Sequence, residues 1–410
     1  MDAAFSFCNE PRYDTFSLNE LAARVGISKP AIYRHFKDKD ALLAAMHERF
    51  ADELAGCLLG IQAAREQHGD AVPHDRFAHI IQFFTDNCHY VNYAIGALSA
   101  QDGFERQITE ELRARGVKNL IGCESDDATG AITVSDFDRY VQAIYCGVTI
   151  FIFIKLRERM LGEGLAVTGT DDFAAKLVRL MTRGLARTVA ADSVLYPAAI
   201  SEARLNELDA LCAVQDGDLA PQDRIFTALA AVISRYKMTG VTVERIADEL
   251  HMAKSSLYEY FANKNEMIKT LILRELALLD TMIKENAVEA RNFSEYIYIH
   301  LETEYAYLRL RPELIPICGW LLMSTAEQPF TRSFESTNPW QKRLPPLLEE
   351  PDLGLALTSE DFISWLGALP VALVVQCIHR DLGDETLQQA VRALFRFIEQ
   401  GIEPEAQSAL

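Results

Sequence analysis

The spacing of apolar residues predicts helices along nearly the whole chain. In DRIFTALAAVISRY, residues 223–236, the residues Ile225, Leu229, Val232 and Ile233 recur at the interval that places them on one face of a helix. No stretch shows a convincing apolar–polar alternation of the kind that marks a half-buried strand. We therefore predict an all-α protein.

The same pattern of apolar positions occurs twice. A shift of 225 residues places residues 16–39 on residues 241–264 without a gap. The same shift places Asp136 and Phe137 on Asp361 and Phe362, and after a shorter loop LVRLMTRGL (177–185) matches LFRFIEQGI (394–402). Five residues are identical in the first alignment: Ala22 and Ala247, Lys29 and Lys254, Tyr33 and Tyr258, Phe36 and Phe261, Lys39 and Lys264. The chain therefore consists of two copies of one helical unit.

The best-matched segment has the signals of two short helices joined by a tight turn. Ser17 and Glu20 form an S-x-x-E capping box, which starts a helix. Gly26 can adopt the left-handed backbone of the turn. Ser28 can cap the following helix, and Pro30 lies in that helix's first turn, where a missing N–H costs little. Helix, turn and helix in this order indicate a helix-turn-helix motif, with Ile32 and Phe36 facing inward.

This segment resembles a known family of DNA-binding proteins. The stretch GISKPAIYRHFKDKDAL closely resembles the DNA-binding segment of the TetR (tetracycline-repressor-like) family, whose signature ends in Tyr, two residues, Phe, two residues, Lys. The stretch SSLYEYFANKNEMI repeats it. The resemblance covers roughly residues 3–50 and 225–275. It implies two tandem units, each with an N-terminal three-helix domain that binds DNA and a helical domain for ligand binding and dimerisation.

The predicted domains follow from the repeat and the resemblance. We expect helix-turn-helix domains at 1–50 and 223–275, which we call head 1 and head 2, and regulatory domains at 51–190 and 276–410. A connector at 191–222 holds Pro197, the helical-looking stretch SEARLNELDALCAV and the turn-like stretch QDGDLAP.

The resemblance also implies which residues bind DNA. A recognition helix enters the major groove, while cationic and polar side chains around it hold phosphates. Lys29 and Lys39 supply charge, the hydroxyl of Tyr33 can donate to a phosphate, and His35 can reach a phosphate or a base edge. The predicted DNA-binding residues are Lys29, Pro30, Tyr33, Arg34, His35 and Lys39 in head 1, and Lys254, Ser255, Ser256, Tyr258, Tyr260 and Lys264 in head 2.

The copies differ where they would read sequence. Arg34 becomes Glu259, and arginine favours guanine or phosphate, whereas glutamate repels phosphate and can accept from cytosine. We therefore predict an asymmetric operator. Head 2 also carries His251 in place of the turn glycine, and histidine tolerates a positive φ better than most residues. Ala253 replaces Ser28, which removes a cap worth about 1 kcal/mol. A weaker second head, or one kept for packing, is the alternative.

Charge and composition narrow the class of protein. The net charge of −19 argues against DNA binding over most of the protein surface. The two predicted heads differ from this average. Residues 12–50 hold seven Lys or Arg against five Asp or Glu, and residues 224–275 hold eight against six, so each segment has a net charge of +2. Eight cysteines without a CxxC pair predict no metal site. The apolar run at 143–156 is too short to span a bilayer, and no signal peptide is visible. We expect a cytoplasmic protein with no membrane partner, no cofactor and no metal.

The family resemblance implies a small-molecule effector whose identity the sequence leaves open. Candidate pocket residues are the aromatic side chains Phe83, Tyr90, Tyr93, Tyr298, Tyr305 and Trp320, although such stripes are more often core. We expect the helices at 137–159 and 173–187 to form a four-helix bundle with those at 362–379 and 387–400, so that one chain acts as a pseudo-dimer, either alone or as a further homodimer.

Two other functions stay open at this point. The heads could serve as a protein–protein interaction module that has lost DNA binding. Catalysis is the less favoured alternative, because the sequence contains no GxSxG, Walker loop, GxGxxG or HExxH motif, and we therefore expect no catalytic residues.

Overall fold

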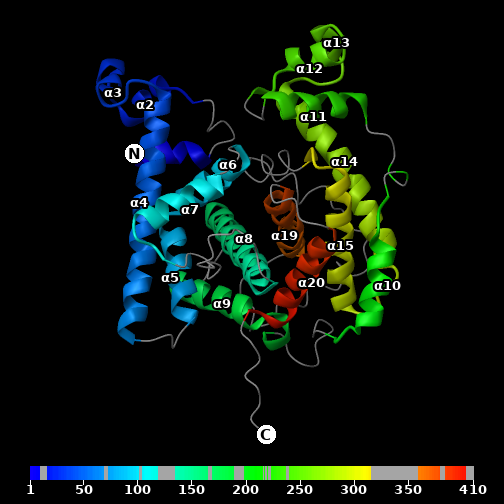
Figure 1. Ribbon diagram of the computed structural model, residues 1–410. Coiled ribbons are helices and arrows are strands. Elements are labelled where there is room, and N and C mark those ends of the chain that lie inside the picture. The colour runs from blue at the N-terminus through cyan, green and yellow to red at the C-terminus, as the bar shows by residue number, and fades with distance from the viewer. Residues whose placement is uncertain are drawn as a thin grey trace. The chain divides into compact units, whose positions relative to one another are not determined.

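The computed structural model is helical throughout the residues that it describes. These are residues 1–9, 16–68, 73–100, 104–118, 134–164, 169–188, 198–215, 217, 219, 223–236, 240–314, 359–378 and 384–402. No strand occurs within these ranges (Figure 1), which confirms the predicted all-α class.

The chain divides into two compact units that do not coincide with the two sequence copies. Unit 1 contains Met1–Leu120 together with Val232–Val241, and unit 2 contains Ile121–Ala231, Thr242–Ile315 and the helices of the C-terminal region. The last helices of the first copy therefore belong to the same compact unit as most of the second copy.

Unit 1 carries head 1 on a long helix. Its elements are α1 (Asp2–Phe5), η1 (Ser6–Asn9), α2 (Leu18–Val25), α3 (Lys29–His35), α4 (Lys39–His68), α5 (Pro73–Asp86), α6 (Cys88–Ala100) and α7 (Phe104–Ala114). The helices α2 and α3 lie at the first end of α4, and α4 then runs into the body and packs against α5 and α7 (Figure 1).

An aromatic cluster joins the start of head 1 to the body of unit 1. Phe5 of α1 is fully buried, and its ring centroid lies 4.8 Å from that of Tyr90 and 5.5 Å from that of Tyr93. Phe50 of α4 lies 5.3 Å from Tyr90. Edge-to-face pairs at these distances add to the stabilisation that burial provides. The short α1 is therefore fixed to α6 by its aromatic residue.

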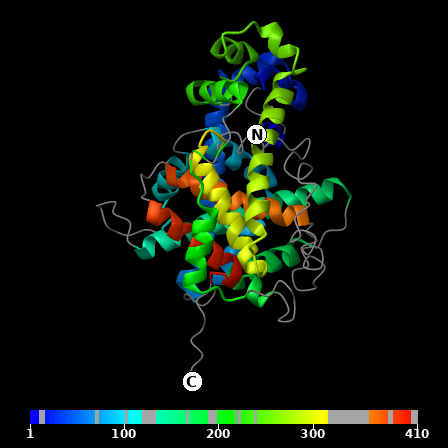
Figure 2. The same cartoon turned by 90° about the vertical axis from the view of Figure 1, so that its right-hand side faces the viewer.

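Unit 2 carries the helix pair of head 2 on a second long helix. Its elements are α8 (Val134–Gly162), α9 (Thr170–Arg183), η2 (Leu185–Arg187), α10 (Glu202–Cys212), the first part of α11 (Arg224–Tyr236), α12 (Val243–Glu249), α13 (Lys254–Tyr258), α14 (Lys264–Ala287), α15 (Phe293–Leu310), α19 (Ser359–Ile378) and α20 (Asp384–Gln400). The helices α12 and α13 lie at the first end of α14 (Figure 2). α15 packs against α10, α14, α19 and α20.

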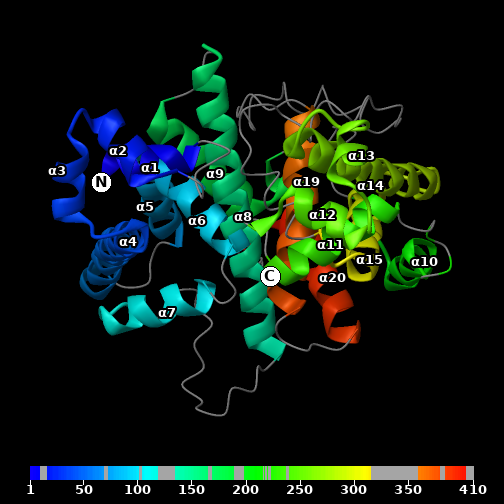
Figure 3. The ribbon, with the colours of Figure 1, turned by 90° about the horizontal axis from the view of Figure 1, so that it is seen from above.

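Helices from both sequence copies pack together in unit 2. α8 and α9 come from the first copy and α19 and α20 from the second; α8 contacts α9, α19 and α20, and α20 also contacts α9 and α19 (Figure 3). The buried Trp365 donates its Nε1–H to Oγ1 of Thr149 over 3.0 Å. Arg159 forms an ion pair with the buried Asp361, with 2.7 Å between Nη2 and Oδ1. The helices that the sequence assigns to one bundle are thus in contact.

Two glycines at matching positions of the repeat let the ends of α9 and α20 meet. Gly184 has φ 62° and Gly401 has φ 76°. A Cβ atom on Gly401 would lie 2.2 Å from the carbonyl oxygen of Thr182, and one on Gly184 would lie 2.4 Å from the amide nitrogen of Gly401. The amide of Ile402 donates to the carbonyl of Met181 over 3.1 Å. Only glycine fits both the backbone angle and this contact.

The helix α8 is longer than its apolar run indicates. Residues Phe137–Gly162 form a 26-residue helix that is long and apolar enough to cross a membrane by length and composition, so the short run at 143–156 does not by itself exclude a span. In the structure 56% of its most apolar window is buried, and α8 packs against α9, α19 and α20. We assign α8 to the core of unit 2.

Candidate nucleic-acid interface

Head 1 folds as the local signals predict, with one exception. Ser17 Oγ accepts from the amide of Glu20 over 3.2 Å, and Glu20 Oε2 accepts from the amide of Ser17 over 2.6 Å, so the capping box is present. Gly26 has φ 75° and ends α2. Ser28 occupies the N-cap of α3 with extended backbone, but its side chain makes no capping bond. Ser28 is therefore the N-cap residue, as predicted, but the predicted capping hydrogen bond from its side chain does not form.

The packing of the two short helices determines which face is free. Ile32 of α3 is 4% exposed and lies in the core with Leu21 and Ala22 of α2. Tyr33, on the outer side of the same helix, is 49% exposed. Leu257 and Tyr258 repeat this arrangement in head 2, at 1% and 44%. Each recognition helix therefore buries one aliphatic residue and leaves its polar face accessible.

The outer faces hold most of the predicted DNA-binding side chains. Lys29, Pro30, Tyr33, Arg34 and His35 are exposed in head 1, as are Lys254, Ser255, Tyr258 and Tyr260 in head 2. Lys39, Ser256 and Lys264 are partly buried. The ammonium group of Lys39 lies 4.8 Å from the ring centroid of Phe16, a cation–π contact that fixes it beside α2.

Head 2 reaches the same turn with a different residue. His251 has φ 54°, the one positive φ of a non-glycine residue in the described ranges, and it occupies the position of Gly26. The amide of Met252 donates to Ala247 over 2.9 Å, and its equivalent Ile27 donates to Ala22 over 2.9 Å. This confirms that histidine adopts the left-handed turn.

Ala253, the N-cap of α13, makes no side-chain capping bond. Since Ser28 makes none either, the predicted loss of a capping bond between the copies does not occur.

Head 2 carries an ion pair that its sequence does not predict. Lys254 Nζ pairs with Glu244 Oε1 of α12 and lies 5.5 Å from the ring centroid of Tyr258. The hydrogen bond between them lowers the pKa of Glu244 and raises the pKa of Lys254. The partners are ten residues apart on different helices, so helical periodicity gives no signal for the pair.

The aromatic residues proposed for a ligand pocket lie in two separate cores. In unit 1, Tyr90 and Tyr93 are buried beside Phe5, and partly buried Phe83 stacks on Tyr90 with 5.9 Å between ring centroids. In unit 2, Tyr298 and Tyr305 of α15 are buried, and Tyr298 donates its hydroxyl to Asp209 of α10. Trp320 lies outside the described residues. Ligand binding by these side chains stays a prediction.

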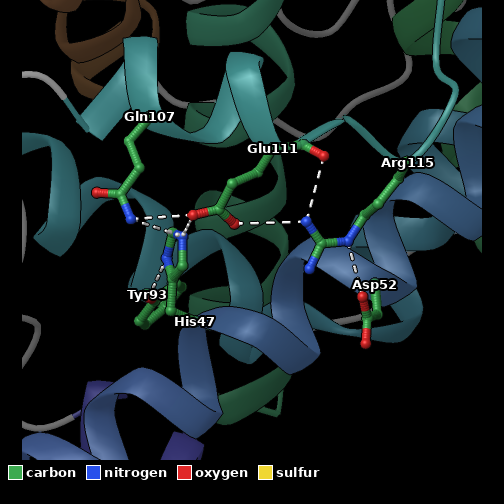
Figure 4. A network of polar contacts seen from close by, with 6 residues as sticks. All are labelled: His47, Asp52, Tyr93, Gln107, Glu111 and Arg115. Atoms are coloured by element: carbon green, nitrogen blue, oxygen red, sulfur yellow. Dashed lines mark hydrogen bonds and ion pairs between the residues drawn. The ribbon is translucent and has the colours of Figure 1, made fainter. Parts of the chain in front are cut away.

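A polar network joins α4, α6 and α7 of unit 1 (Figure 4). The ring of His47 lies between Tyr93 and Glu111, with Nδ1 3.0 Å from the Tyr93 hydroxyl and Nε2 3.0 Å from Glu111 Oε1. Gln107 also donates to Glu111, and Arg115 donates to Asp52 over 2.7 Å. Burial raises the pKa of Glu111, but its bonds from Gln107 and His47 outweigh burial and lower it. The network fixes α7 against the helix that carries head 1.

Buried acids distinguish α15 of unit 2. Glu302 is 6% exposed and Glu304 is 5% exposed, and Glu304 pairs with His300 over 3.4 Å. Burial, with the nearby charge of Asp209, raises the pKa of Glu302 to about 8 despite opposing Arg392 and Arg309. Asp and Glu residues normally occupy solvent-exposed positions, so the sequence does not predict that Glu302 and Glu304 are buried.

Two helix pairs with buried inner aliphatics and accessible outer faces define a helix-turn-helix protein of the DNA-binding class. The family model described as "Bacterial regulatory proteins, tetR family" matches residues 1–46 and again residues 225–271. The HTH-type transcriptional repressor SCO4008 of Streptomyces coelicolor is 26% identical over 191 residues, which cover 44% of this chain and 95% of that relative. The chain therefore carries two TetR-like units in tandem, each with a segment that matches this family model.

Proposed function

We propose that the protein is a cytoplasmic transcription regulator that binds an asymmetric DNA operator through both heads of one chain. The regulation is repression that a small-molecule effector relieves. The observation that carries the proposal is the accessible recognition face, with Tyr33 and Tyr258 each about half exposed above a buried aliphatic residue. The similarity to a protein named as a transcriptional repressor supports the sign of regulation.

The bundle in unit 2 supports a pseudo-dimer. Helix-turn-helix proteins bind two half-sites about 34–36 Å apart with two recognition helices, which dimers usually supply. Here α8 and α9 of the first copy pack against α19 and α20 of the second, as the helices of two protomers would. A covalent link makes the second DNA contact intramolecular, which raises its effective concentration.

Differences between the recognition faces support an asymmetric operator. Arg34 and His35 of head 1 are exposed, and so are their equivalents Glu259 and Tyr260 in head 2. Because arginine and glutamate favour different base edges, the two half-sites should differ in sequence.

Selection of bound duplexes from a random library tests the proposal. The wild-type chain should enrich two unlike half-sites, Tyr33→Ala should lose information at one of them, and Tyr258→Ala at the other. Recovery of a perfect palindrome would overturn the asymmetry. Failure of the wild-type chain to enrich any sequence would overturn DNA recognition.

A second candidate function is a protein-interaction role for head 2. The pairing of Lys254 with Glu244 and the exposed Glu259 favour it, since both reduce attraction to phosphate. Salt dependence separates the two functions, because phosphate binding releases counterions and gives a steep decrease of affinity with salt.

A further inference from the structure

We propose that Glu244 attenuates the DNA binding of head 2 by holding Lys254 with a carboxylate where a DNA phosphate would otherwise bind. The inference rests on the proposed function and adds to it an affinity-determining residue and an order in which the heads engage.

The geometry makes the carboxylate a competitor of phosphate. Glu244 lies in the first turn of α12 and Lys254 is the first residue of α13, so the pair bridges the two helices of the motif. Their side chains are 55% and 45% exposed. The lysine ammonium also lies beside the ring of Tyr258. Lys254 and Tyr258, both of which the family resemblance assigns to DNA, thus lie beside each other, and the lysine is already paired with a carboxylate.

Head 1 lacks the competitor. The residue of head 1 that aligns with Glu244 is Asn19, which carries no charge. Lys29, the equivalent of Lys254, forms no ion pair within the described part of the chain and is exposed. The same lysine is therefore available for phosphate in one copy and occupied in the other.

The surrounding charges act in the same direction. Residues 18–40 of head 1 hold five Lys or Arg against three Asp or Glu, whereas residues 243–265 of head 2 hold three against four. Two of the changes replace a cation by an acid, because Glu249 and Glu259 align with Arg24 and Arg34. A duplex that approaches the α12–α13 segment of head 2 therefore meets a net charge of −1, against +2 on the equivalent segment of head 1, and an occupied lysine.

The pair weakens binding without abolishing it. Exposed ion pairs are weak, so the dense charge of a duplex can replace the carboxylate once the phosphate is held close. Head 1 supplies that proximity if it binds first. We infer an order in which head 1 captures the duplex and head 2 engages in a second step.

Exchange of the two aligned residues in the full-length chain tests the inference. The probe is a duplex selected by the wild-type protein, with a random-sequence duplex beside it, and affinity is measured by fluorescence anisotropy from 50 to 300 mM salt. Glu244→Asn should bind both duplexes about three- to ten-fold more tightly at the lowest salt, with a slope of log affinity against log salt steeper by about one. Asn19→Glu should change both quantities in the opposite direction.

Two further variants separate the ion pair from general charge. Glu289→Asn makes the same charge change on an exposed residue beyond the last turn of α14, at the far end from head 2, and should leave affinity and slope unchanged. In the double variant Glu244→Asn with Lys254→Gln, the gain should disappear, because the released lysine is then absent. A gain that persists without Lys254, or an equal gain in Glu289→Asn, overturns the inference.

The outcomes also distinguish this inference from the function on which it rests. If wild type binds the duplexes with a steep salt dependence and Glu244→Asn changes neither affinity nor slope, the inference is wrong and the proposed function stands. If wild type binds neither duplex in a salt-dependent manner, the proposed function is wrong and the inference fails with it.

Discussion

At the residue scale, the tight turn of the motif uses two different side chains in one backbone geometry. Gly26 and His251 both adopt a positive φ, at 75° and 54°, and both are followed by the same amide-to-carbonyl bond. The sequence predicts this turn because caps and turn residues depend on neighbours a few positions away. It does not predict the Glu244–Lys254 pair, since that contact depends on how two helices cross.

We expect Gly26→Ala to destabilise head 1 by about 1 kcal/mol, because an alanine in this backbone region is strained. No atom lies within 4 Å of the added Cβ, so the loss would come from the backbone alone. In head 2, His251→Gly should instead stabilise by about 0.5 kcal/mol. Hydrogen exchange of the amides in α2 and α12 measures each local effect. Equal protection in wild type and Gly26→Ala would contradict the prediction.

The burial of Glu302 predicts a pH-dependent stability. Its pKa is about 8 in the folded chain against an ordinary 4.5, so the folded state binds the proton more tightly than the unfolded state. The stabilisation of the folded state by this tighter proton binding is complete below pH 4.5 and is lost as the pH rises through 8. Glu302→Gln should therefore be more stable than wild type at pH 9, with a free energy of unfolding in urea that is higher by roughly 1–3 kcal/mol. At pH 5 the difference should be smaller.

The exposed Glu285 of α14 provides the control for this measurement. Glu285→Gln should follow the wild-type pH profile. A Glu302→Gln profile parallel to wild type between pH 5 and 9 would show that Glu302 is ionised in the folded chain.

At the element scale, the sequence predicts the helices and their pairing better than it predicts the side-chain contacts that hold the helices together. The repeat identifies α8, α9, α19 and α20 as related pairs, because matching apolar faces imply matching packing. The sequence predicts a helical stretch in the connector, but it does not predict that α10, which forms there, packs against α15. Arg204 pairs with Glu295 and Arg392 with Asp209, and these contacts join residues 91 and 183 positions apart. Contacts over such separations leave no local pattern in a single sequence.

The glycine contact between α9 and α20 predicts a steep cost for one methyl group. Gly401→Ala would place Cβ against the backbone of Thr182 in a strained conformation, and we expect a loss of at least about 2–3 kcal/mol. Gly147→Ala, in the middle of α8 with no atom within 4 Å, should stabilise by about 0.5–1 kcal/mol. Thermal unfolding followed by circular dichroism compares them, and similar melting temperatures would refute a close backbone contact.

At the scale of the whole molecule, the repeat predicts a protein that brings two heads to DNA in one chain. We expect one 46.0 kDa chain to bind one selected duplex, because both copies already supply the helices of the bundle. Sedimentation velocity of the protein with a labelled duplex should show a complex of one chain and one duplex. Complexes that always contain two chains, and so four heads, would contradict the pseudo-dimer.

The hydrogen bond from Trp365 to Thr149 has a consequence for the history of the gene. The positions that align with these two residues hold Tyr140 and Val374, and valine has no side-chain acceptor. If a shortened gene encoded the second copy alone, two such chains would have to form the bundle. Trp365 of one chain would then face Val374 of the other, and its buried indole N–H would have no acceptor. Divergence of this kind makes each half dependent on the other, so deletion of either would be selected against and the duplication would be retained.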